Sequence, residues 1–250
     1  MDRMLYTAMS GAKQTLDQQA VVTHNLANAA TPGFRAQLQA MRAIDVEGEG
    51  LPTRSVVQVS TPGADFAPGP VSMTGRALDV ALDRNAWLAV QAEDGSEGYT
   101  KRGDIQVDAN GMLRVAGRPV IGEGGPVVVP LGSQVSIGGD GTIAALGEGE
   151  TPENVAQVGR LKLVSAEPGS LLRSDDGLFR AAPNAQGNVQ PLPADENARL
   201  ASGALEGSNV SATEAMVAMI GNARRYELQM KTIRSAEENA QRANSLLSLS

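Results

Sequence analysis

The residue types that most often carry catalysis or bind metals are scarce in this chain. His24 is the single histidine, and there is no cysteine. Thiol catalysis and cysteine-ligated metal sites are therefore excluded, and one histidine without carboxylates around it cannot form a metal site. A Ser-His-Asp arrangement is equally hard to build, and no motif supports a Ser-Lys variant. We predict that the protein is not an enzyme and has no catalytic residue, metal or cofactor.

Three short stretches have the letters of a binding site. The Gly-rich run 122–126 lacks the Lys-Ser/Thr of a phosphate loop and precedes no helix pattern, so we interpret it as a tight turn between strands. Arg102-Gly103-Asp104 is an adhesion tripeptide by its letters, and here it fits a turn before a strand at 105–107. Asp175-Asp176 could hold a cation, but a solvated turn is the better interpretation.

Charge is uneven along the chain, whose net charge is -7. Residues 1–35 and 211–250 each carry a net charge of +1, so the excess of acidic residues lies between them. An acidic middle argues against a nucleic-acid partner, because phosphate binding needs a basic face. No stretch approaches the ~18 consecutive apolar residues of a membrane span, and the N-terminus lacks the apolar segment of a cleaved secretory signal. We expect no membrane span and, for any export, a route without a cleaved signal.

The first helix is predicted over residues 3–29. Its apolar and polar residues recur at alternating spacings of four and three, which is typical of a helix seam. The members of this seam are Leu5, Met9, Ala12, Leu16, Gln19, Thr23 and Leu26.

The second helix is predicted over residues 211–249. Ser211-Ala212-Thr213-Glu214 is a capping-box pattern. Two lines of residues seven apart follow it, and these are Met216, Ala223, Met230, Glu237 and Asn244, then Met219, Tyr226, Ile233, Ala240 and Leu247. Either helix alone would be marginal in water, so we expect the two to pack as a coiled-coil-like layer. The spacing leaves open whether one pair buries both seams or neighbouring subunits share the burial.

The middle of the chain has the pattern of β structure. Short apolar or alternating runs occur over residues 76–182, separated by Asp-Gly and Asn-Gly dipeptides that suit turns with positive φ. Such a pattern predicts a compact antiparallel domain, of sandwich or barrel type. The Pro/Asn/Gly-rich residues 183–203 are expected to be loop. The fold class is therefore α+β, with domains at 1–35 (N-terminal helix), 36–75 (extended connector), 76–204 (β domain) and 205–250 (C-terminal helix).

The first helix is expected to end at a device that turns the chain. Pro32 cannot continue a helix, and Gly33 can adopt a positive φ. Phe34, one of only three phenylalanines, follows at once and is expected to anchor the turn by packing. We interpret 25–35 as the joint between the helical layer and the β domain, with a structural and interfacial role.

At this point the residues carry a family resemblance. The run Asn25-Leu26-Ala27-Asn28-Ala29-Ala30-Thr31-Pro32-Gly33-Phe34-Arg35 resembles the signature of bacterial flagellar rod and hook proteins. Leu205-Glu206-Gly207-Ser208-Asn209-Val210 resembles the entry to the C-terminal helix of that family, and 98–104 and 173–179 agree in order. In length and detail the chain resembles the proximal-rod member most, with the distal-rod and hook-type members as alternatives.

The resemblance implies an axial structural protein. Such a protein would be exported unfolded by the flagellar type III apparatus, and would polymerise helically in the periplasmic space with copies of itself and with other rod proteins. It would transmit motor torque and would have no small-molecule substrate. The residues expected to act in assembly are Leu5, Met9, Leu16, Asn25, Leu26, Asn28, Thr31, Pro32, Gly33, Phe34, Met216, Met219, Ala223, Tyr226, Met230, Ile233 and Leu247.

Two rival classes remain open on the sequence alone. A ligand-binding or catalytic β domain with helical appendages would need a polar pocket with perturbed titratable groups. A secreted adhesin would need Arg102-Gly103-Asp104 to be exposed, and it would leave both helix seams without a role.

Overall fold

The structure is a computed structural model that describes residues 2–38, 41–45, 55–59, 63–147, 149, 155–167, 169–184 and 187–248. The chain forms two compact units. The helical unit contains Met1–Ala29, Gln37–Gly63 and Val210–Ser250, and the β unit contains Ala30–Ala36 and Ala64–Asn209. The residues 36–75, expected as one connector, thus contribute to both units. The α+β class with an N-terminal and a C-terminal helix is confirmed.

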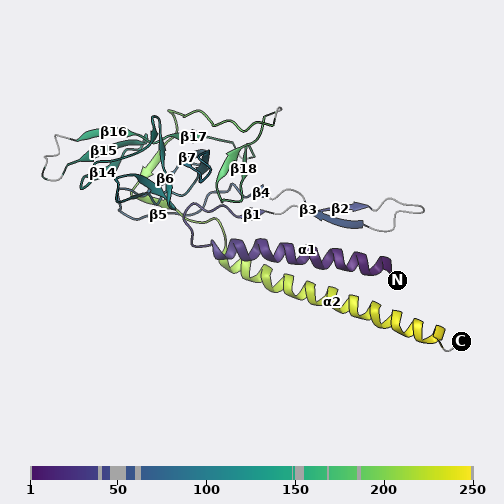
Figure 1. Ribbon diagram of the computed structural model, residues 1–250. Coiled ribbons are helices and arrows are strands. Elements are labelled where there is room, and N and C mark those ends of the chain that lie inside the picture. The colour runs from purple at the N-terminus through teal and green to yellow at the C-terminus, as the bar shows by residue number, and fades with distance from the viewer. Residues whose placement is uncertain are drawn as a thin grey trace. The chain divides into compact units, whose positions relative to one another are not determined.

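The helical unit contains the two long helices, α1 (Asp2–Ala27) and α2 (Ala212–Ser248). They lie side by side and run in opposite directions (Figure 1). The backbone N–H of Glu214 donates to Ser211 Oγ at 3.3 Å, so the predicted N-cap of α2 is present. A hairpin of β2 (Met41–Asp45) and β3 (Ser55–Val59) also belongs to this unit, and β3 contacts α1. Helix α1 therefore contacts both α2 and this hairpin within its own unit.

The β unit is built from short antiparallel strands. Its largest sheet has the order β17-β7-β8-β19-β18, and a three-stranded sheet has the order β14-β15-β16. The strands of these two sheets are β7 (Ala86–Gln91), β8 (Glu97–Thr100), β14 (Gln134–Ile137), β15 (Thr142–Leu146), β16 (Ala156–Arg160), β17 (Leu163–Ser165), β18 (Leu171–Arg173) and β19 (Phe179–Ala181).

Small sheets complete the chain. A third strand group has the order β11-β10-β9, and four two-stranded pairs are β12-β13, β20-β6, β21-β5 and β1-β4. Their bounds are β1 (Gln37–Leu38), β4 (Gly63–Ala64), β5 (Val71–Met73), β6 (Val80–Leu82), β9 (Gln106–Val107), β10 (Leu113–Val115), β11 (Arg118–Pro119), β12 (Ile121–Gly122), β13 (Gly125–Pro126), β20 (Leu200–Ser202) and β21 (Ala204–Glu206).

Strand β7 is the centre of the β unit because both of its faces are buried. Leu88 and Val90 point into a large aliphatic core with Ile105 and Leu113, while Trp87 and Ala89 point into a second cluster. In that second cluster Trp87 contacts the ring of Phe179 at 4.8 Å between centroids, and Phe66 packs on both rings. A strand buried on two sides has a continuous apolar run, and residues 86–90 are such a run in the sequence.

The predicted turns are found where the dipeptides placed them. The glycines of the three Asp-Gly and one Asn-Gly turns, Gly95, Gly111, Gly141 and Gly177, all have positive φ. The run 122–126 is a turn between β12 and β13, as predicted. The expectation of loop over 183–203 is wrong at its end, because Leu200–Ser202 pairs with β6. The alternation of Leu200, Ala201 and Ser202 is too short to be recognised before the pairing strand is known.

Candidate assembly site

The contact between α1 and α2 includes small and polar residues at its most buried positions. The Thr15 hydroxyl lies 3.1 Å from Gln229 Oε1, and Gly11 leaves room for the same side chain. A Cβ at Gly11 would stand 2.8 Å from Gln229 Nε2. Ala12, Asn222 and Ala236 are also buried. The close approach of the two helices thus depends on side chains that bury little apolar area.

The predicted seam of each helix consists of two lines of residues that recur every seven positions. Only one of these two lines lies on the inner face of the helix pair. On α1 the line Leu5, Ala12, Gln19 and Leu26 is buried or half-buried, as is the line Ala8, Thr15 and Val22. The other predicted line of α1, with Met9, Leu16 and Thr23, is exposed. The covered line Ala8, Thr15 and Val22 of α1 thus lies one position before the predicted one, and the same displacement by one residue occurs on α2. There Met219, Tyr226 and Ile233 lie on the covered face together with Ala215, Asn222 and Gln229.

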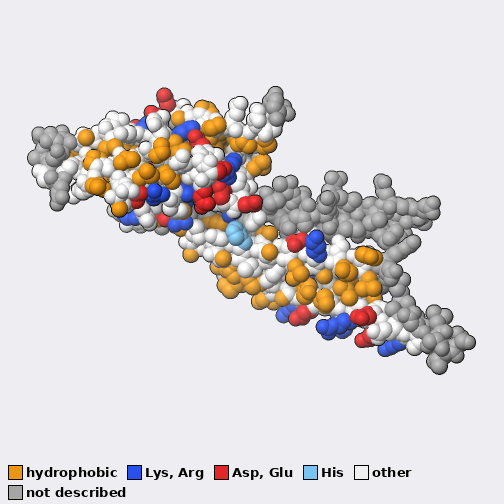
Figure 2. All heavy atoms as spheres, in the orientation of Figure 1, with side chains coloured by type: hydrophobic (Ala, Val, Ile, Leu, Met, Phe, Trp, Pro, Cys, Tyr) orange, Lys and Arg blue, Asp and Glu red, His pale blue; other side chains and the backbone are white. Residues whose placement is uncertain are grey.

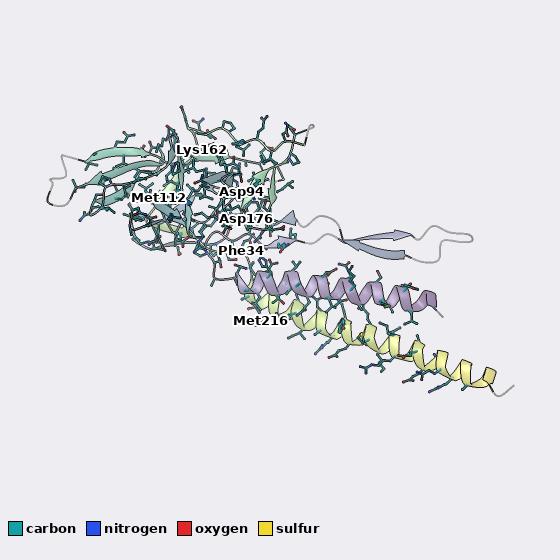
Figure 3. The ribbon with its side chains drawn as sticks, viewed as in Figure 1. Phe34, Asp94, Met112, Lys162, Asp176 and Met216 are labelled. Carbon is teal, nitrogen blue, oxygen red and sulfur yellow. The ribbon has the colours of Figure 1, made fainter. Side chains whose placement is uncertain are left out.

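Large apolar side chains therefore remain on the outside of the helix pair. Leu16 is 52% exposed on α1, where Tyr6 and Met9 are exposed as well. On α2, Met216, Val217, Ile220 and Leu228 are exposed, and Val217 reaches 65%. We call these residues the outer apolar faces of α1 and α2. Figure 2 shows hydrophobic side chains gathered over the helices, and Figure 3 labels Met216 on α2.

The remaining seam residues lie between these extremes. Met230 is half-buried and Ala223 is exposed. The side chain of Leu247 lies outside the described part of the chain, although its backbone belongs to α2. The sequence left open whether one helix pair buries both predicted seams. In a single chain it does not, because part of each seam is exposed.

Helix α1 ends with two asparagines that bond to the backbone. Asn25 accepts a hydrogen bond from Gln37 N at 2.8 Å, and its Nδ2 donates to Gln37 O at 2.9 Å. Asn28 Nδ2 donates to His24 O at 2.9 Å, which satisfies a carbonyl of the last helical turn. Asn25 thereby holds the strand that leaves the joint, and Asn28 closes the helix end.

The chain then turns tightly at Pro32-Gly33. Phe34 N donates to Thr31 O at 3.3 Å across this turn, and Gly33 has a φ of +65°. Proline followed by a glycine with positive φ is the pattern of a type II turn. Gly33 also touches backbone on the far side, since a Cβ there would lie 2.3 Å from the carbonyl carbon of Lys101. Both the conformation and the space at this position exclude a side chain.

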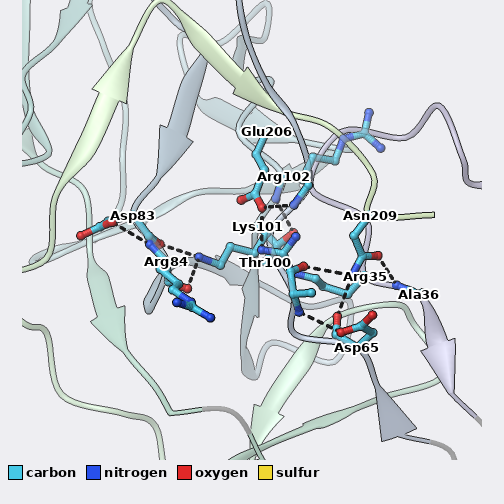
Figure 4. Close-up of polar contacts among 12 residues, drawn as sticks. Arg35, Ala36, Asp65, Asp83, Arg84, Thr100, Lys101, Arg102, Glu206 and Asn209 are labelled. Carbon is cyan, nitrogen blue, oxygen red and sulfur yellow. Dashed lines mark hydrogen bonds and ion pairs between the residues drawn. The ribbon is translucent and has the colours of Figure 1, made fainter. Parts of the chain in front are cut away.

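Arg35 forms a buried ion pair with Glu206. Its Nη2 lies 2.7 Å from Glu206 Oε1, and the two side chains are only 1% and 3% exposed. Gly33 N also donates to Glu206 O at 2.7 Å, and Gly69 N donates to the Glu206 carboxylate at 2.8 Å. The segment that follows α1 and the segment that precedes α2 are therefore tied together inside the β unit (Figure 4).

Asn209 adds a second tie between these segments. Its Oδ1 accepts from Ala36 N at 2.7 Å, and its Nδ2 donates to Asp65 O and Ala67 O, both at 3.0 Å (Figure 4). Asn209 N donates in turn to Phe34 O at 3.3 Å. One asparagine thus bonds three separate stretches of backbone. We call residues 31–36 with Arg173, Glu206 and Asn209 the helix-exit joint.

Phe34 is buried, as an anchor should be, and a cation lies over its ring. The Arg173 guanidinium carbon is 4.7 Å from the ring centroid, and Arg173 Nη1 donates to Arg35 O at 2.8 Å. Burial lowers the pKa of Arg173 below its ordinary value. The side chain remains charged at neutral pH because an arginine titrates far above that range.

Lys101 is a buried cation beneath the joint. Its Nζ donates to Asp83 O at 2.6 Å and to Arg84 O at 2.9 Å, and it lies 5.2 Å from the Trp87 ring centroid. Desolvation lowers the pKa of Lys101 to about 8, against a smaller opposing effect of Glu206. The two carbonyl acceptors and the aromatic ring explain how an ammonium is accommodated there.

The geometry argues against the adhesin alternative. Arg102 and Asp104 pair with each other, with Arg102 Nη2 at 2.7 Å from Asp104 Oδ2, and Gly103 between them is buried. The tripeptide is thus engaged within the β unit rather than presented to a receptor. Among the described residues, no group of three or more His, Asp and Glu side chains is placed to hold a metal ion. No helix in the described part of the chain is long and apolar enough to cross a membrane.

Sequence reasoning missed three residues of the joint. Glu206 and Asn209 lie in a segment that carries the family resemblance, yet nothing in that segment indicates that they contact 31–36. Arg173 has no link to Phe34 in the sequence. The available signal was the placement of a charged Arg35 directly after an anchoring aromatic, since a charge in a buried segment requires a partner.

Comparison with known proteins adds a separate finding. A family model described as "Flagella basal body rod protein" matches residues 5–35, and one described as "Flagellar basal body rod FlgEFG protein C-terminal" matches residues 201–246. The flagellar basal-body rod protein FlgF of Salmonella typhimurium is 59% identical, and that of Escherichia coli is 57% identical. Both alignments cover 100% of this chain and 100% of the relative. The flagellar basal-body rod protein FlgG of Buchnera aphidicola is 28% identical over 90% of the chain and 92% of that protein.

Proposed function

Because this chain belongs to the flagellar basal-body rod protein family, we propose that it is a structural subunit of the proximal rod that polymerises helically through its two terminal helices. The outer apolar faces of α1 and α2 are the observation that carries this proposal. The relatives named FlgF match over their full length and at higher identity than the FlgG relative described above, which favours the proximal-rod member over the distal-rod alternative.

The helix pair is built to associate further. Its internal contact includes the close approach at Gly11, the polar contact between Thr15 and Gln229, and the buried side chain of Asn222. Several of its large apolar residues, among them Leu16, Met216 and Ile220, are left outside. Burying a Leu, Met or Ile side chain stabilises a structure by about 1.5–3 kcal/mol. Contact with neighbouring subunits would supply this stabilisation repeatedly along a rod. If these residues packed inside the helix pair of one monomer, they would not be available for contacts with neighbouring subunits.

The joint supports the mechanical part of the role. A subunit that carries torque needs its chain segments to stay together under load. The Arg35–Glu206 ion pair, the Gly33–Glu206 backbone bond and the Asn209 contacts tie the two segments that lead to the helices. In this proposal the joint keeps the two segments that lead to the helices together under load.

The partners are other copies of this chain and other flagellar rod proteins, and the location is the basal-body rod in the periplasmic space. Export occurs unfolded through the flagellar type III apparatus. The lack of cysteine suits such a route, since no disulfide can obstruct an unfolded chain. The protein acts by assembly and carries out no reaction.

The proposal is tested by paired substitutions on the outer apolar faces. Leu16→Gln together with Ile220→Gln should abolish motility in a strain that lacks the chromosomal copy, while the purified monomer keeps its melting temperature. Leu172→Gln is the matched control, because Leu172 is 46% exposed on β18 of the β unit. Normal motility of the helix variant, or an equal loss in the control, would contradict the proposal. The deletion strain itself should be hookless and non-motile.

A further expectation concerns order before assembly. The terminal helices leave large apolar side chains such as Leu16 and Ile220 exposed within one chain, so we propose that they become fully ordered only when subunits stack. Limited proteolysis of the pure monomer should therefore cut the ends faster than residues 76–182. Ends that resist cleavage as well as the β unit does would overturn this part of the proposal.

A further inference from the structure

We propose that Met9 and Met216 are oxidation sites that block assembly of the subunit when their thioethers are converted to sulfoxides. The inference rests on the proposed function, because it concerns the outer apolar faces through which the subunit assembles. It adds a chemical sensitivity that the family's structural role does not include.

Two exposed methionines of the chain lie on these faces. It has no cysteine and nine methionines, so thioethers are its only sulfur nucleophiles. Met9 on α1 is 55% exposed and Met216 on α2 is 49% exposed, while Met219, Met230 and Met112 are half-buried. Susceptibility to oxidation follows exposure, so Met9 and Met216 should react before the half-buried methionines.

The reaction needs only a two-electron oxidant such as hydrogen peroxide. The thioether sulfur attacks one peroxide oxygen, the O–O bond breaks and an S–O bond forms. The sulfur is oxidised, the peroxide is reduced, and the second oxygen leaves as water after taking up the peroxide protons. The side chain keeps its length but gains a strongly polar group.

The structural consequence differs between the free and the assembled subunit. In the free chain a sulfoxide at Met9 or Met216 points to solvent, so it should leave the fold unchanged. In the assembled state the same group would be taken out of water against an apolar neighbour, which is unfavourable without a hydrogen-bond partner. We therefore expect oxidation to raise the concentration needed for self-association about tenfold or more.

Met73 provides an internal control. It is the most exposed described methionine, at 81%, and it lies on β5 of the β unit rather than on a helix. Its sulfoxide should form as readily as those of Met9 and Met216. Under this proposal its oxidation has no effect on assembly.

The test combines chemistry with substitutions. Purified protein is treated with hydrogen peroxide, the sulfoxides are assigned by mass spectrometry, and self-association is measured by sedimentation velocity. Met9→Leu with Met216→Leu should assemble normally and resist the oxidant, whereas Met73→Leu should remain sensitive. Leucine suits this purpose because it has nearly the volume and helix propensity of methionine. Incubation with the two methionine sulfoxide reductases should restore assembly of the oxidised wild type.

The outcomes separate this inference from the function beneath it. Untreated protein that neither self-associates nor supports motility would count against the proposed function. If untreated protein assembles and oxidised protein assembles equally well, the oxidation proposal is wrong, as it is if the double leucine variant is inhibited like the wild type. A motility assay in cells tests the oxidation proposal without relying on self-association in vitro. Met9→Gln with Met216→Gln, which imitates the polar sulfoxide, should reduce motility, and Met73→Gln should not.

Discussion

In the β unit the large apolar side chains face inward on both sides of β7, whereas in the helical unit Tyr6, Leu16 and Ile220 face solvent. Both units bury polar residues, but of different kinds. The β unit buries Arg35, Lys101 and Glu206, and the helical unit uses Thr15, Asn222 and Gln229 in its internal contact. The β unit is therefore a finished fold with charges locked inside it. The helical unit leaves large apolar side chains exposed, and under our proposal neighbouring subunits cover them.

The largest loss of stability should come from Gly33→Ala in the β unit. The new Cβ would meet the backbone of Lys101 and Arg102 at 2.3 and 2.4 Å, and the backbone cannot swing away as a side chain can. We expect the free energy of unfolding to fall by about 4 kcal/mol or more. Urea denaturation of the β-unit transition, followed by Trp87 fluorescence, measures it.

Gly75→Ala is the matched control for this change. Gly75 has a similar φ of +75° in the same unit, but no atom lies within 4 Å of the point where a Cβ would stand. It should lose only the cost of positive φ, about 1 kcal/mol. Equal losses in the two variants would show that the close approach at Gly33 does not stabilise the joint.

The next effect should come from breaking the buried ion pair. Arg35→Met leaves the Glu206 carboxylate buried without its cation, so we expect a loss of about 3 kcal/mol or more. The exposed Arg242–Glu238 pair on α2 is the comparison, and Arg242→Met should cost less than about 0.5 kcal/mol. Chemical denaturation of both variants provides the values. A small loss at Arg35 would mean that the tie between the helix exits is held by Asn209 and the backbone bonds alone.

Raising the pH should stabilise the β unit through Lys101. Its pKa is lowered to about 8, while the unfolded chain keeps the ordinary value of 10.5, so the unfolded state binds more protons between these values. Stability contributed by this group therefore rises with pH across that window, with a slope of up to about 1.4 kcal/mol per pH unit. Lys101→Met should remove the rise, as seen in urea midpoints measured from about pH 7.5 to about pH 10.

Tyr99 sets the upper end of the useful pH window. Its burial raises the pKa of the phenol far above the ordinary value of 10, so the unfolded state loses that proton first and stability falls above about pH 10. The difference between the wild type and Lys101→Met cancels this contribution. A flat difference from about pH 8 to about pH 10 would contradict the assignment to Lys101.

The smallest effect on the monomer should come from the helical unit. Leu16→Gln removes an exposed apolar side chain, so the free energy of unfolding should change by less than about 0.5 kcal/mol. Leu88→Gln, at a fully buried position of β7, should instead prevent stable folding of the β unit. Circular dichroism melts of the two variants measure this difference. A large loss at Leu16 would show that the outer face of α1 is covered within one chain.

Local chemistry made much of the fold predictable. The helix patterns, the capping residues before α2 and the Asp-Gly and Asn-Gly turns all depend on neighbours in sequence. The helix register was harder, because matching heptads selects the largest apolar residues. In this protein Met9, Leu16 and Met216 are exposed, and Thr15, Asn222 and Gln229 take their places. A sequence that places its best apolar residues on the outside misleads a search for an internal seam.

The helix-exit joint was only partly predictable, because some of its residues become partners only in the folded structure. Pro32, Gly33 and Phe34 indicate a turn and an anchor by their own properties. Glu206, Asn209 and Arg173 become partners only once the strands β5, β21 and β18 are placed in space. The positive φ of Gly33 followed from its sequence context, but its contact with the backbone of Lys101 did not.

The ties between 33–36 and 206–209 also define where force passes through the β unit. A pull on the two segments that lead to the helices acts first across Arg35–Glu206, Gly33–Glu206 and Ala36–Asn209, since these close the loop of chain that contains the sheets. The β strands lie within that closed loop, so they bear no pulling force until these ties break. Stretching the unit by its ends in a single-molecule experiment should therefore give one high rupture at the joint before any strand is peeled from the five-stranded sheet.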